Sequence, residues 1–206
     1  MRFTVSQQVF PTKGNLMKLN KSLALARVGY DLLDRKRNIL IRETMSLIDR
    51  AGSIQTEINE SYINAYKALQ TANIDLGIVE EYARSVPVEN GLGVSSRSVM
   101  GVEIPTVTLN SSGVKNYFGY RKTSFQLDKA YIEFDKVKRR TAELAEIENS
   151  VYRLAEGIRK TQKRANALKN IVIPRFETQI KAITAALDEK EREEFSRLKV
   201  IKKIVK

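Results

Sequence analysis

A seven-residue repeat of apolar and small side chains limits the fold of this chain more than any other feature of the sequence. It runs without a proline from Leu16 to about residue 83, with neighbouring positions alternately three and four residues apart. A stripe with this period stays covered only when its helix supercoils left-handed around a partner. A helix of a globular bundle is the alternative, but such helices rarely exceed about 25 residues without a break. The repeat therefore predicts a coiled coil. Its positions are Leu16, Leu19, Leu23, Ala26, Tyr30, Leu33, Arg37, Leu40, Thr44, Leu47, Ala51, Ile54, Ile58, Ser61, Ala65, Ala68 and Ala72.

A second stripe of the same kind begins after Ser124, a candidate helix cap, and continues to Val172 before it resumes at Ile180. Pro174 interrupts it, and because the stripe survives on both sides we expect a bend there and not a break. Two such segments in one chain fold back most simply as an antiparallel hairpin. If residue 83 pairs with residue 124, Leu40 faces Ala167 and Leu16 faces Glu191.

The stretch between the two stripes has a different composition. It holds half of the chain's glycines and prolines together with partly alternating, β-branched runs, which predict a small β-hairpin. We expect this hairpin to pack on the helix ends. The expected fold is all-α: a long antiparallel two-helix coiled coil with a small β-hairpin cap at the helix connection. Its parts are an extended segment (1–14), the shaft (15–84 and 124–206) and the cap (85–123).

The residue types present exclude most enzyme chemistry. The chain has no cysteine and no histidine, so thiol nucleophiles, imidazole bases and the common zinc and haem ligands are absent. Gly91 and Gly93 lack the third glycine of a dinucleotide fingerprint, and carboxylate pairs such as Glu80 and Glu81 would lie solvated on a thin coiled coil. We therefore expect no catalytic, cofactor or metal site. Without a signal sequence or an apolar run of about 18 residues, the expected location is cytoplasmic, with no membrane insertion.

Positive charge concentrates at the two chain ends, which an antiparallel hairpin brings together. The formal net charge is +12, and both termini carry lysine and arginine almost without acids. Residues after Arg192 would extend beyond the first helix, so their apolar stripe needs an external partner, and the charge favours an anionic one. The candidate contact residues of this tip are Lys13, Lys18, Lys21, Arg192, Phe195, Arg197, Leu198, Lys199, Lys202 and Lys203.

One charged residue, Arg37, occupies a seam position, where charge costs stability and commonly specifies register. It either meets a partner across the seam, near residues 170–172, or extends its head to solvent beside a charged run. Arg35, Arg37, Asn166 and Pro174 are the residues to which we assign the register and the bend of the shaft.

Three stretches of the sequence resemble the D subunit, the central rotor stalk of V/A-type ATPases. They are Phe10–Lys13 leading to Leu32–Asn38, then Lys163–Leu168 with Val172–Pro174, and finally Glu191–Lys199. Asp34, where the family tends to be basic, and Lys169, where it tends to be acidic, depart from the pattern.

The resemblance implies a non-catalytic shaft that transmits torque between the catalytic hexamer of A and B subunits and the membrane rotor ring during ATP-linked ion transport. The tip would enter the hexamer and the F subunit of the central stalk would dock on the side. The cap would face the rotor-ring adaptor (C/d type) through Val99, Val102, Ile104, Pro105 and Val107, and the complex would hold the chain peripheral to the cell membrane. The alternative is a basic coiled-coil scaffold for nucleic acid or an anionic membrane surface, which would need basic residues along one face.

Overall fold

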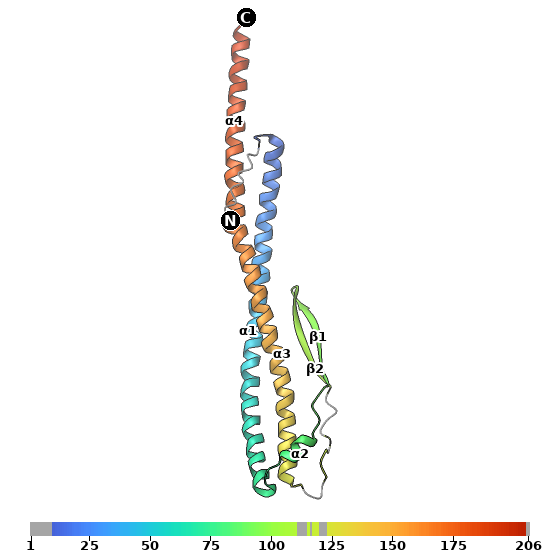
Figure 1. Cartoon of the computed structure of the whole chain (residues 1–206). Coiled ribbons are helices and arrows are strands. Elements are labelled where there is room, and N and C mark those ends of the chain that lie inside the picture. The colour runs from blue at the N-terminus through green and yellow to red at the C-terminus, as the bar shows by residue number, and fades with distance from the viewer. Residues whose placement is uncertain (1–9, 111–114, 116, 120–122, 205–206) are drawn as a thin grey trace. The chain divides into compact units, whose positions relative to one another are not determined.

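The structure is a computed structural model that describes residues 10–110, 115, 117–119 and 123–204. The chain divides into two compact units, one made by the chain up to Asn38 together with Arg159 onward, the other by Ile39–Ile158. In chain order the elements are α1 (Lys13–Leu76), α2 (Glu80–Ser85), β1 (Leu92–Val99), β2 (Val102–Leu109), α3 (Phe125–Ala167), a π-helical segment (Leu168–Val172) and α4 (Ile173–Ile204) (Figure 1).

Local sequence signals set both ends of α1. Thr12 caps its start, since its hydroxyl oxygen accepts a hydrogen bond from the Asn15 N–H at 3.2 Å. Gly77 follows its last residue with a φ of +75°, a left-handed conformation that glycine adopts at low cost, and donates its N–H to the Asn73 carbonyl. The repeat predicted a helix to about residue 83; the structure ends α1 at Leu76 and places the short α2 after it.

The predicted seam is confirmed, and with it the fold class. Every seam position of α1 from Leu16 to Ala72 is buried or half-buried. Contacts in each unit show that the helices pair antiparallel. In the first unit, Lys13 forms an ion pair with Glu191, and Arg27 forms one with Glu177. In the second, clusters join Ile54, Ile58 and Ile147, and farther along α1 they join Ala72, Val79 and Leu127.

The predicted facing positions are only partly right. Glu191 pairs with Lys13, one helical turn from the expected Leu16. Leu40, expected to face Ala167, is instead fully buried in a cluster with Leu154 and Ile104. The counting began from residue 83, whereas α1 already ends at Leu76, so the pairing is displaced along the second helix.

The two strands form an antiparallel hairpin that pairs Leu92 with Leu109 and Val99 with Val102. Met100 and Gly101, the two turn residues, have φ values of 51° and 74°, as a two-residue hairpin turn of primed type requires. The expectation that this hairpin packs on the helix ends is wrong. Figure 1 shows it running along α3, and its residue Ile104 lies in the cluster with Leu40 and Leu154, midway along the long helices.

Pro174 lies at the start of α4, directly after the π-helical segment. The Ile173 N–H donates to the Leu168 carbonyl, five residues back, which is the π-helical bond. The helix therefore continues through the proline, as predicted, and the change of winding occurs just before it.

Candidate functional site

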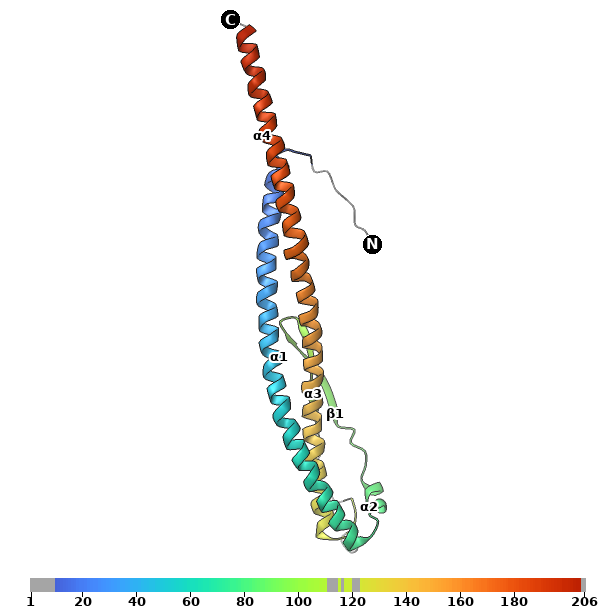
Figure 2. The ribbon, with the colours of Figure 1, turned by 90° about the vertical axis from the view of Figure 1, so that its left-hand side faces the viewer.

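The end of α4 carries an apolar stripe with no partner among the described residues. Figures 1 and 2 both show α4 extending beyond the first residues of α1, within the same unit. Phe195 and Leu198 are 62% and 64% exposed, and Ile201 is also exposed. These side chains are three apart and share one helical face. The structure thus places Phe195 and Leu198 where the sequence predicted, uncovered by α1.

The basic residues of this tip are exposed, and several form weak pairs. Lys13 donates a hydrogen bond to Glu191 at 2.9 Å, and this bond raises the pKa of the lysine and lowers the pKa of the carboxyl. Arg192 and Arg197 pair with acids of their own helix at 3.8 and 3.6 Å. Lys199 lies 5.2 Å from the centre of the Phe195 ring. Lys18, Lys21, Lys202 and Lys203 are exposed as well. Exposed pairs of this kind contribute little stability, so the charge remains available to a partner.

Arg37 binds across the seam, but not at the predicted position. Its guanidinium donates to the side-chain oxygen of Gln162 at 2.7 Å and pairs with Asp34 on its own helix at 2.8 Å. Gln162 in turn donates to Asn166. The predicted position near residues 170–172 was therefore between about two and three helical turns too far along the second helix. Arg35 is exposed.

The predicted cap residues dock the hairpin onto α3. Ile104 is fully buried, and Val99 and Val102 pack against its cluster. The Val107 N–H donates to a carboxylate oxygen of Glu146 at 2.8 Å, and the Ser150 hydroxyl donates to the Pro105 carbonyl at 3.4 Å.

A glycine that the sequence analysis did not single out makes this docking possible. Gly157 of α3 lies so close to the hairpin that a Cβ there would be 2.7 Å from the Val102 Cγ2 atom. An isolated glycine within a helical pattern is the signal that could have identified the approach. Glu146 and Ser150 gave no such signal, because polar residues on a predicted coiled coil are ordinarily solvated.

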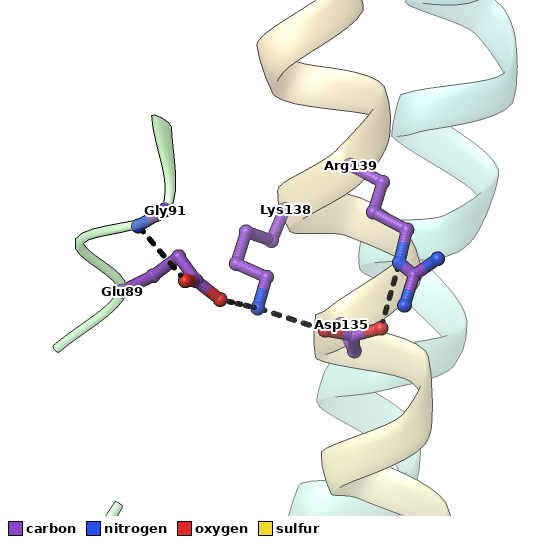
Figure 3. Close-up of polar contacts among 5 residues, drawn as sticks. All are labelled: Glu89, Gly91, Asp135, Lys138 and Arg139. Carbon is purple, nitrogen blue, oxygen red and sulfur yellow. Dashed lines mark hydrogen bonds and ion pairs between the residues drawn. The ribbon is translucent and has the colours of Figure 1, made fainter. Parts of the chain in front are cut away.

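A chain of charged groups fastens the segment before β1 to α3 (Figure 3). Glu89 accepts hydrogen bonds from the Gly91 N–H and from Lys138, each at 3.1 Å. Lys138 also pairs with Asp135 at 2.8 Å, and Asp135 accepts a bond from Arg139 at 2.9 Å. We call Glu89, Lys138 and Asp135 the clasp.

The clasp holds its members in their charged forms. The hydrogen bond from Lys138 lowers the pKa of Glu89. Burial raises the pKa of Asp135, but the bonds from Lys138 and Arg139 outweigh it and the net direction is downward. The bond to Asp135 raises the pKa of Lys138. All three groups therefore remain ionised at neutral pH.

Beside the clasp lies an open cavity of about 560 Å³ between α2 and α3. Its walls are largely apolar and include several aromatic rings: Tyr82 and Phe118 meet edge to face, and Phe118 meets Tyr131 in the same way. Burial raises the pKa of Tyr131. The cavity lining also includes one cation, Lys138, and two acids, Glu89 and Asp135, so the clasp forms part of the cavity wall.

The described part of the chain has no group of three or more acidic side chains placed to hold a metal ion. None of its described helices is long and apolar enough to cross a membrane. Three features of the described residues are candidate binding surfaces: the exposed apolar end of α4, the docked hairpin, and the cavity beside the clasp.

Comparison with known proteins gives matches along nearly the whole chain. The family model for the ATP synthase D subunit matches residues 15–203. The chain is 45% identical over 199 residues to the V-type ATP synthase D subunit of Thermotoga neapolitana, covering 96% of this chain and 98% of the relative. It is 37% identical over 202 residues to the A-type ATP synthase D subunit of Thermococcus kodakarensis, covering 96% and 94%. The corresponding protein of Methanopyrus kandleri is 38% identical over 205 residues, covering 98% and 88%.

Proposed function

This chain belongs to the family of ATP synthase D subunits, and from that premise we propose that it is the central-stalk shaft that transmits torque between the catalytic hexamer and the membrane rotor ring. A torque shaft needs length, stiffness and surfaces for partners at separate places, and it needs no reactive group. Helices of 64 and 43 residues, paired along a buried seam, supply the first two requirements.

The single observation that carries the proposal is the uncovered end of α4. An apolar stripe of Phe195, Leu198 and Ile201, surrounded by lysine and arginine, is costly to leave in water unless a partner receives it. A sleeve with an apolar lining and acidic rim, formed by the A and B subunits, would satisfy both features. In this proposal the tip turns inside the hexamer.

The other partners fit other exposed side chains. The connection end presents Ile74 and Ile78, 83% and 86% exposed, and we assign this end to the rotor-ring adaptor of C/d type. On the side of α1, Ile41, Met45 and Ile48 form an exposed i, i+4, i+7 row suited to a packed helix, which we assign to the F subunit of the central stalk. Through these partners the chain would be held peripherally at the membrane.

Deletion of residues 193–206 tests the role of the tip. Because the described part of this segment is exposed, the deletion should leave thermal unfolding of the isolated chain nearly unchanged while it weakens assembly with the catalytic hexamer. Neutralising Arg197, Lys199, Lys202 and Lys203 in the full chain should make assembly less dependent on salt. A matched control neutralises four exposed basic residues of the other unit, Lys67, Arg84, Lys129 and Arg153.

Two outcomes would overturn the proposal. One is a large loss of intrinsic stability on truncation with hexamer binding untouched, because the tip would then be part of the fold. The other is salt-dependent binding of the isolated chain to DNA or anionic liposomes with no association with ATPase subunits, which would favour the scaffold alternative.

A further inference from the structure

Along β1, which is one edge of the hairpin, every second residue directs its backbone N–H and C=O groups away from β2. The Asn110 N–H donates to the Gly91 carbonyl at 2.9 Å, which makes this pair a hydrogen-bonded one. Hydrogen-bonded and non-hydrogen-bonded pairs alternate along an antiparallel ladder. The register then directs the peptide groups of Leu92, Val94, Ser96 and Ser98 away from β2.

On β2, the alternate residues likewise direct their backbone groups away from β1, and two of these groups bind α3. Val107 pairs with Val94, and its N–H points outward to Glu146 of α3. Pro105, which has no N–H, pairs with Ser96, and its carbonyl accepts the Ser150 hydroxyl. α3 thus provides partners for two backbone groups of the β2 edge. The sheet has two strands, and the β1 edge meets no other described strand.

The β1 edge lacks the features that usually prevent strand addition. Proteins protect an exposed edge with proline, lysine, a bulge or a very short strand. β1 has eight residues and continuous pairing, with no proline or lysine, and Arg97 is its single charged residue. Leu92 and Val94 are 53% and 67% exposed on the face turned away from Ile104, so apolar side chains continue to the edge.

From this edge we infer that β1 accepts an extended strand of a partner subunit, which enlarges the hairpin to a three-stranded sheet. Arg97 indicates the chemistry of that strand. It pairs with Ile104 across the hairpin, is exposed, and has no ion pair among the described residues. The incoming strand therefore carries an acidic residue opposite Arg97 and apolar residues on the face of Leu92 and Val94. The inference rests on membership of a multisubunit complex and does not depend on torque transmission.

Hydrogen exchange of single amides tests the inference in the full chain, alone and in the assembled ATP synthase. The Leu92, Val94, Ser96 and Ser98 amides should exchange rapidly in the isolated chain and at least about tenfold more slowly in the complex. The ladder amide of Ser95 reports on the hairpin itself and should be protected in both.

Ser96→Pro provides a variant that blocks the edge without disturbing the hairpin. Ser96 makes no ladder bond, and its cross-strand neighbour is itself a proline, so the substitution is tolerated while the outward N–H is lost. In the complex, Ser96→Pro should return the Val94 and Ser98 amides to rapid exchange, and the matched control Ser96→Ala should not.

Three results would overturn the inference. The complex could assemble with all four edge amides exchanging as in the isolated chain, or Ser96→Pro could keep them protected. Protection that appears in the isolated chain as its concentration rises would instead identify a second copy as the occupant. Co-purification with the other ATP synthase subunits shows whether the chain enters the complex. If it does not enter, the expectation of assembly drawn from the family is wrong as well, whereas a complex that assembles with unprotected edge amides contradicts the strand-addition inference alone.

Discussion

Replacing Gly157 by alanine should loosen the hairpin while it strengthens the helix. In an ordinary helix interior, glycine to alanine is stabilising by about 1 kcal/mol. At this position the new Cβ would lie 2.7 Å from Val102 Cγ2 and 3.5 Å from Cγ1. A valine side chain has little freedom to move aside, because its branched Cβ restricts χ1.

The magnitude follows from the geometry of the contact. Forcing one extra carbon into a packed contact typically costs about 1–3 kcal/mol. This cost applies only to the docked hairpin, so it should shift the equilibrium between docked and undocked hairpin by roughly 5- to 150-fold, since about 1.4 kcal/mol is a factor of ten. The gain in helix propensity stabilises α3 equally whether the hairpin is docked or undocked. It should therefore appear only in the free energy of unfolding of the helices.

The Val107 amide is the natural reporter, because its hydrogen bond to Glu146 exists only while the hairpin is docked. In Gly157→Ala its exchange should accelerate by the factor above, while the thermal midpoint of the helical signal stays level or rises. The double variant Val102→Ala/Gly157→Ala removes the obstructing methyl groups and should recover most of the protection. Unchanged Val107 exchange in the single variant, or equal loss in the double variant, would refute the reasoning.

Other predictions concern the core, the clasp and the seam. Leu154→Ala, at a fully buried position, should lower the free energy of unfolding by about 2–5 kcal/mol in denaturant titrations. Because the pKa of Asp135 is lower in the folded state, its carboxylate stabilises the fold at pH values above its unfolded pKa, and this stability is lost as the pH falls through the folded pKa. Because the pKa of Lys138 is higher in the folded state, its ammonium stabilises the fold at pH values below its unfolded pKa, and this stability is lost as the pH rises through the folded pKa. The thermal midpoint should therefore fall at both extremes, and Lys138→Met should flatten both slopes. Arg37→Lys keeps the charge but loses the fork to Gln162, and should cost about 1–2 kcal/mol in chemical unfolding.

The seam could be predicted from sequence because its cause is local. A seven-residue stripe dictates which face of a helix must be covered, whatever covers it, and even polar positions such as Thr44 and Ser61 are half-buried as the pattern requires. The register could not be fixed in the same way. It depends on where the chain turns, and a single glycine, Gly77, ends α1 earlier than the apolar pattern does.

The position of the hairpin depends on contacts between distant segments. Its strands were foreseeable from β-branched residues, but the sequence near them does not specify which part of a long helix they contact. Three features of α3 decide this: space at Gly157, a carboxylate at Glu146 and a hydroxyl at Ser150. Each of these residues is ordinary on a charged helix. Their role follows only from their common position along α3, where all three contact β2.

The π-helical segment shows how the sequence pattern and the structure agree at a finer level. A strict repeat alternates spacings of three and four, but Leu168, Val172, Phe176 and Ile180 follow one another four apart, so the chain holds one residue too many for continuous α-helical winding. Pro174 marks where the excess can be absorbed, because it has no N–H for the preceding turn. The wider π turn takes in the extra residue, and Phe176 and Ile180 accordingly return to the half-buried face. The π turn therefore preserves the seam beside the proline, and the stripe continues on both sides of Pro174.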